Sequence, residues 1–143
     1  MAKVEVSLKD GVLLVRLSDG DDLEAGLAAA LKQNNLTSGV VVGGVGMLRN
    51  AALSFYVGKG EYETVPVEGE AELCALSGNV STMDGEMVIH LHAVLGMQGG
   101  AALAGHLSKG QVNMTAEIAI MITPQRMVRV VDSKTGLRLL KFT

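Results

Sequence analysis

Apolar and polar residues alternate along most of this chain, a pattern typical of β-strands that bury one face. Residues 4–8 and 12–17 alternate in this way on either side of Lys9, Asp10 and Gly11, which predicts a β-hairpin. Beyond residue 38 the same kind of pattern recurs between glycine-containing turns. It predicts further strands over residues 40–42, 48–58, 62–67, 71–81, 87–95, 111–122 and 127–131.

One segment near the N-terminus has the period of a helix instead. Leu23, Leu27 and Leu31 recur every four residues in an alanine-rich stretch. The Asp-Asp-Leu-Glu sequence at 21–24 supplies an N-terminal cap, and the pattern ends at Asn34. One helix followed by many short strands predicts an α+β fold dominated by an antiparallel β-sheet.

Length and composition support a single domain over residues 1–143. The chain is 48% hydrophobic but has no Trp and only two Tyr and two Phe, so its core must be aliphatic. The only cysteine, Cys74, lies in an apolar stretch and is expected to be a small buried side chain in a reducing compartment. The sequence shows neither a signal-peptide pattern nor an apolar stretch long enough to span a membrane. We therefore expect a soluble cytoplasmic protein.

The net charge of −3 and the pI of about 5.6 argue against DNA binding through a broadly basic surface. Positive charges do gather near the C-terminus, but the simpler interpretation of this cluster is a solvent-exposed strand face. If DNA binds to the chain alone, we expect weak, nonspecific binding that moderate salt abolishes. The basic residues of this segment are Arg126, Arg129, Lys134, Arg138 and Lys141.

All three histidines of the chain fall within one short stretch. His90 and His92 are two residues apart in a predicted strand, so their side chains share one face. His106, in the next segment, can complete a set of three imidazoles. Three protein ligands leave one position open on a tetrahedral ion, which is typical of reactive zinc sites. Ordinary hydrogen-bonded histidines are the alternative, and the spacing alone leaves both interpretations open.

Two charged residues in apolar strands need partners, because an unpaired buried charge is costly. We expect Glu117 and Arg49 to lie within one shell of the histidines. There Glu117 would orient an imidazole or accept a proton from metal-bound water, although a plain salt bridge is an equal alternative.

The glycines of residues 43–46 indicate a bend with close backbone approach, not a phosphate-binding loop. Alternation also places three polar side chains on one face of the strand predicted over residues 71–81: Ser77, Asn79 and Ser81.

Several short motifs resemble, in order, those of the PPC domain family, which is shared by plants and prokaryotes. The similarity extends over residues 4–122, and Glu117 with the apolar strand after it also fits the family pattern. The motifs are Gly-Met-Leu-Arg-Asn at 46–50, Leu-Ser-Gly-Asn-Val at 76–80, Asp-Gly at 84–85, His-Leu-His-Ala at 90–93 and Gly-His-Leu at 105–107.

The resemblance implies a domain with a main antiparallel sheet that assembles as a homotrimer. The high apolar content, with few aromatic residues, also suggests apolar surface beyond one core. The resemblance further implies a divalent metal, zinc above all, at His90, His92 and His106. Imidazole ligands suit zinc and similar metals.

Function follows less directly from the resemblance. In the plant members an AT-hook binds the DNA minor groove, but no Arg-Gly-Arg-Pro element occurs here. The plant Gly-Arg-Phe-Glu-Ile-Leu segment, which contacts other transcription factors, corresponds to Gly-Glu-Ala-Glu-Leu-Cys at 69–74. Two hypotheses remain. One is a trimeric, DNA-associated regulatory protein with a structural or sensory metal. The other is a metal-dependent enzyme that acts on a small intracellular molecule bound near the metal.

Overall fold

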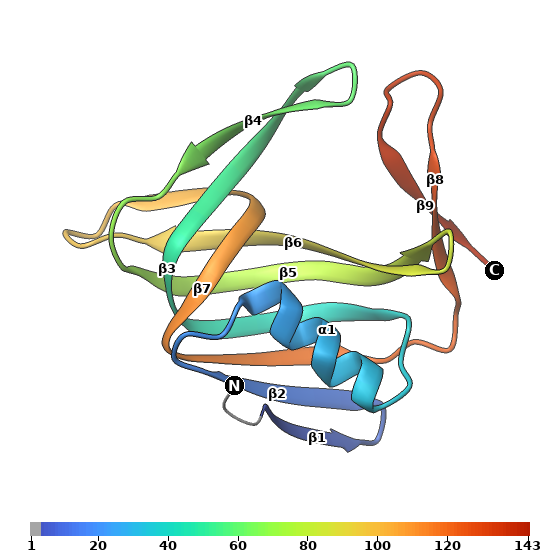
Figure 1. Cartoon of the computed structure of the whole chain (residues 1–143), viewed down its shortest axis with the longest axis horizontal. Helices are drawn as coiled ribbons and strands as arrows, with labels where there is room; N and C mark the ends of the chain where they lie inside the picture. The colour runs from blue at the N-terminus through green and yellow to red at the C-terminus, as the bar shows by residue number, and fades with distance from the viewer. Residues whose placement is uncertain (1–3) are drawn as a thin grey trace.

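A nine-stranded β-sheet forms most of the protein, and one α-helix covers part of one of its faces (Figure 1). The structure is a computed structural model and describes residues 4–143. The predicted α+β fold dominated by antiparallel strands is confirmed. The elements are β1 (Glu5–Lys9), β2 (Val12–Ser18), α1 (Leu23–Gln33), β3 (Gly39–Gly58), β4 (Glu61–Pro66), β5 (Ala71–Met83), β6 (Glu86–Gly96), β7 (Ala102–Met121), β8 (Met127–Val131) and β9 (Arg138–Phe142).

Helix α1 forms where the leucine period predicts it. The Asp22 carboxylate accepts a hydrogen bond from the Ala25 N–H at 2.9 Å and so caps the first turn. Leu23, Leu27 and Leu31 are all buried against the sheet, chiefly against β2 and β7. At eleven residues α1 is too short to cross a membrane, and residues 4–143 contain no other helix.

The sheet closes on itself around the long strands. Its main path runs β1-β2-β7-β3-β5-β8-β9, and all of these neighbours are antiparallel except β5 and β8. In addition, β6 pairs with both β5 and β7, and β4 extends β3. Because β3, β5, β6 and β7 form a closed circuit of pairings, residues distant in sequence are held at fixed register.

Two predicted strand boundaries are wrong. The segments 40–42 and 48–58 belong to one continuous strand, β3, and the predicted bend is accommodated as bulges on either side of Gly43–Gly46. The expected close approach is present, since a Cβ on Gly46 would lie 2.1 Å from the Thr115 carbonyl oxygen. Strand β7 begins at Ala102 instead of residue 111, and strand β9 was not predicted.

Cys74 also differs from its prediction, because its side chain is exposed. The pairing of β5 with β6 shifts between Leu73 and Ala75, so that a bulge interrupts the alternation there. Leu73 is buried while both residues that follow it are exposed.

Candidate metal centre

The three histidines come together on two neighbouring strands. His90 and His92 lie on one face of β6, and His92 is directly opposite His106 of β7 in the antiparallel register. The ring centroids are 5.0 Å apart for His90 and His92, 5.1 Å for His90 and His106, and 5.5 Å for His92 and His106. One ligand nitrogen from each ring can be chosen so that all three lie within 4.8 Å of one another.

The ring nitrogens fit a metal ion. The Nε2 atoms of His90 and His92 are 3.1 Å apart. Two nitrogens bound to a tetrahedral zinc at about 2.0–2.1 Å are separated by about 3.3 Å. Nδ1 of His106 is buried and has no hydrogen-bond partner among the described residues. The two Nε2 atoms at ligand spacing and the unpartnered, buried Nδ1 of His106 together fit a metal-binding set.

The local electrostatics lower the pKa of two of these rings. Burial lowers the pKa of His90 to about 4, and the nearby Arg129 charge and the other two histidines add to this effect. Burial, with a smaller contribution from His92, also lowers the pKa of His106. Neutral imidazoles have a free lone pair at neutral pH, and only that form binds a metal.

Arg129 of β8 lies next to the histidines, although the sequence analysis placed it only among the C-terminal basic residues. Its guanidinium lies beside His90, with NH2 3.1 Å from His90 Nδ1. It also donates to the side chains of Asn79 and Ser81 on β5, at 2.6 Å and 3.1 Å. These two acceptors belong to the polar face that alternation predicted for residues 77–81. Nothing in the Val-Arg-Val pattern of β8 distinguishes Arg129, because its position depends on a long-range strand pairing.

A pocket of about 590 Å³ opens next to His90 and His106. Tyr62 of β4 forms part of its wall, with its ring centroid 5.5 Å from that of His106. The remaining wall is partly apolar and also includes Glu24 of α1 and Arg138 of β9. Its apolar residues are Val88, Ile89, Leu137 and Leu139.

Arg49 and Glu117 are not beside the histidines, so the expectation of a shared shell is wrong for the single chain. Arg49 donates to Asp19 at 2.6 Å and to Asn113 at 2.7 Å, which satisfies its charge locally. Glu117 is exposed, and its carboxylate accepts a 3.4 Å hydrogen bond from Thr115. It lies eleven residues beyond His106 on β7, or roughly 35 Å of extended strand at about 3.3 Å per residue.

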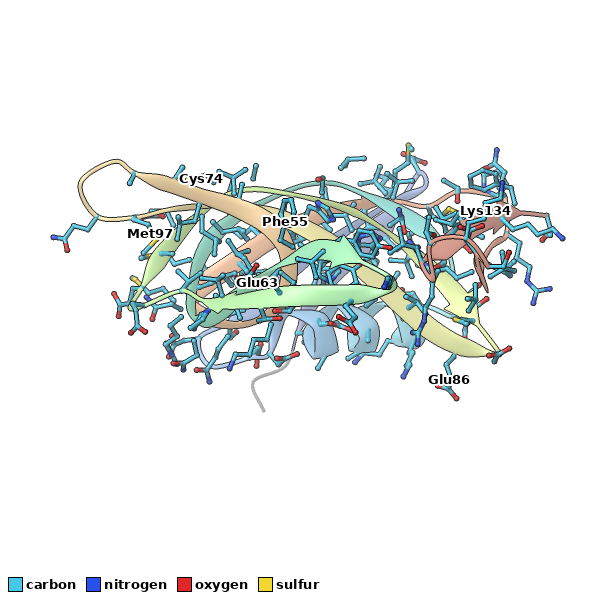
Figure 2. All side chains as sticks on the ribbon, turned by 90° about the horizontal axis from the view of Figure 1, so that it is seen from above. Phe55, Glu63, Cys74, Glu86, Met97 and Lys134 are labelled. Carbon is cyan, nitrogen blue, oxygen red and sulfur yellow. The ribbon has the colours of Figure 1, made fainter. Side chains whose placement is uncertain are left out.

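The C-terminal basic residues form a hairpin of β8 and β9 at one end of the molecule. Figure 2 shows Lys134 in this hairpin, at the end opposite Met97. Arg126, Arg138 and Lys141 are exposed, whereas Arg129 turns inward to the histidines. Arg129 is therefore not available as a phosphate contact.

Comparison with known proteins defines the family. The Plants and Prokaryotes Conserved (PCC) domain matches residues 7–124, and the chain belongs to this family. A search of curated proteins finds no match.

Solved structures with the same fold cover almost the whole chain. A "putative DNA binding protein" from Bacteroides thetaiotaomicron is 25% identical, with a TM-score of 0.90 and 97% of each chain covered. A plant- and prokaryote-conserved (PPC) protein from Pyrococcus horikoshii is 27% identical, with a TM-score of 0.83, and covers 99% of this chain and 96% of its own. A metal-containing protein from Archaeoglobus fulgidus is also 27% identical, with a TM-score of 0.83 and 99% of each chain covered.

Proposed function

We propose that this protein binds one divalent metal ion, zinc in the first instance, through His90, His92 and His106. The observation that carries the proposal is the convergence of three imidazoles, one with an orphaned buried nitrogen, beside an open pocket. The metal-containing archaeal relative supports it. Bound there, the ion would act as a Lewis acid or hold a water molecule or ligand at its fourth position.

The pocket makes a small-molecule role the best-supported use of this metal. A closed structural site uses four protein ligands, whereas this cluster offers three and faces about 590 Å³ of space. We therefore favour a metal-dependent enzyme or small-molecule binder over a purely structural centre. Its place in the cytoplasm is part of the proposal, since an exposed free cysteine suits a reducing compartment.

The experiment is metal analysis of the purified protein together with zinc titration of His92→Ala. We expect one ion per chain in the wild type and at least a 100-fold lower affinity in the variant, because two imidazoles cannot hold the ion as three do. Glu117→Gln is the matched control, and its zinc affinity should equal that of the wild type. If His92→Ala binds zinc as tightly as the wild type, the ligand assignment is wrong.

Assembly as a homotrimer is the second part of the proposal. Leu13, Val15 and Leu17 of β2 are buried under the helix, so the alternate side chains of β2 point to the opposite face. That face is largely apolar in the single chain, apart from Glu117 and the ion pair of Arg16 with Glu5. It contains a groove of about 450 Å³ along β1, β2, β3 and β7. Large apolar side chains exposed on these strands include Leu8, Val12, Leu14, Val42, Val45, Met114 and Met121.

Association with DNA is the alternative function, and the exposed part of the basic hairpin favours it. The Bacteroides protein that shares the fold carries the name "putative DNA binding protein". With a net charge of −3 and Arg129 turned inward, few phosphate contacts remain. We propose that the chain alone binds DNA weakly, with the exposed cations of the hairpin as its contacts.

A further inference from the structure

Arg129 is a partly buried cation without an acidic partner. Among residues 4–143 the ion pairs are Arg16 with Glu5 and Arg49 with Asp19, and neither involves Arg129. Its acceptors are all neutral: Ser81 Oγ, Asn79 Oδ1, the Arg138 carbonyl and His90 Nδ1. A desolvated charge of this kind calls for an opposite charge.

A bound metal ion increases the excess of positive charge. Three neutral imidazoles leave the two positive charges of a divalent ion uncompensated, and Arg129 adds a third. Glu24, which is exposed, is the one acidic residue that lines the pocket, and the exposed Arg138 lines it as well. With a divalent ion bound, the pocket would therefore carry a net charge of about +3.

Metal binding also releases hydrogen-bond donors of Arg129. The four contacts above use its Nε–H, one N–H of NH1 and both N–H groups of NH2. When a neutral imidazole binds metal through Nε2, its Nδ1 carries the proton. His90 Nδ1 can then no longer accept from NH2. One N–H on each terminal nitrogen becomes free, and a carboxylate accepts such a pair well.

We propose that the open position of this centre takes a small monoanionic carboxylate whose second charge partner is Arg129. The inference rests on the proposed metal site and names the class of its ligand. The apolar wall next to the histidines suits an acid with an apolar body. The same apolar wall makes it costly to desolvate a second negative charge, which disfavours a phosphate dianion.

The experiment uses the full chain loaded with Co²⁺, whose visible spectrum reports the ligands of the ion. Benzoate, its neutral counterpart benzamide, and inorganic phosphate are titrated into the wild type, and affinity is checked by calorimetry. We expect benzoate to change the spectrum and bind at least tenfold more tightly than benzamide or phosphate. The metal-free protein should bind benzoate at least tenfold more weakly than the loaded protein. Equal binding of benzoate and benzamide would overturn the proposal without any variant, and tighter binding of phosphate would overturn the carboxylate assignment.

Variants then test Arg129 itself. Arg129→Gln should keep Co²⁺ affinity within a few fold and lose at least tenfold in benzoate affinity. Arg129→Lys keeps the charge and should recover much of that loss. Arg126→Gln, in the same hairpin but exposed, should behave as the wild type. If Arg129→Gln binds benzoate as the wild type does, Arg129 only anchors the hairpin. If the wild type binds no metal, the metal proposal has failed instead, so the two failures are distinguishable.

Discussion

Gly78 of β5 is the position where the smallest change should do the most harm to the histidine cluster. It pairs with Leu91, between the two histidines of β6. A Cβ built on it would lie 1.9 Å from the His90 carbonyl oxygen and 3.1 Å from the Leu91 Cα. Both are backbone atoms, so no side-chain rotation relieves the contact.

The cost of Gly78→Ala follows from the separation that the strands would need. An ordinary carbon–oxygen contact of about 3.2 Å requires β5 and β6 to move apart by roughly 1.3 Å at this point. Ladder hydrogen bonds of about 2.9 Å would then exceed 3.5 Å and break. Two lost bonds at about 1 kcal/mol each, with one group left unsatisfied at about 1–3 kcal/mol, give a loss of about 3–5 kcal/mol. That is a large share of the 5–15 kcal/mol that is typical of a domain.

Urea unfolding in the presence of a chelator measures this loss without a contribution from metal. Gly43→Ala is the matched control, because a Cβ there meets nothing within 4 Å and the φ of Gly43 is not positive. We expect the control to be as stable as the wild type or more stable by up to about 1 kcal/mol. Gly78→Ala should also weaken zinc binding, since it displaces the backbone that carries His90. A Gly78→Ala protein within about 1 kcal/mol of the control would refute the reasoning from strand spacing.

Three further predictions use pH, mass and salt. In the metal-free protein, the folded-state pKa of His90 lies at about 4, below its ordinary value of 6.5, so the unfolded chain binds more protons between these values. The free energy of unfolding should fall by about 1–2 kcal/mol as the pH drops from 6.5 to 4, after allowance for solvent screening of a half-exposed group. His90→Gln should remove most of this dependence in urea titrations. Light scattering at micromolar concentration should give the mass of a trimer, and a monomer mass would contradict the assembly. DNA binding by the chain alone should be weak and lost at moderate salt, and Arg126→Glu should weaken it more than Arg129→Glu; tight binding at physiological salt would instead support the regulatory function.

Local sequence patterns predicted the parts of this fold that local physics decides. The β1–β2 hairpin and helix α1 follow from a two-residue or four-residue period with a turn or cap at the end. The shared face of His90 and His92 follows from strand alternation alone. The first half of β7 was missed because residues 102–110, apart from Leu103 and Leu107, are small or polar and lack alternation. That segment is a strand because β6 and β3 pair with it on both sides.

The surroundings of the histidines depended on contacts that no local pattern encodes. Arg49 and Glu117 are charged residues in apolar strands, and the sequence correctly indicated that Arg49 needs a partner. It could not indicate that Asp19, thirty residues away, would be that partner. Likewise, β8 pairs with the rest of the sheet at one parallel position, Thr82 with Val128, so no local pattern indicated that Arg129 would face His90.

The way the strands hold this centre divides it into a rigid part and a movable part. The histidines lie on β6 and β7, which belong to the closed circuit of paired strands and keep their ligand nitrogens in place without a metal. Arg129 belongs to a hairpin that pairs with the rest of the sheet at a single position. Side-chain hydrogen bonds also hold this hairpin, among them those of Arg129 to Asn79 and Ser81 and that of Tyr56 to the Thr135 carbonyl. Loss of His90 Nδ1 as an acceptor would therefore act on the less constrained partner. In the proposed site, the histidine geometry would set the metal affinity, whereas the position of the β8–β9 hairpin would set which ligand the metal receives.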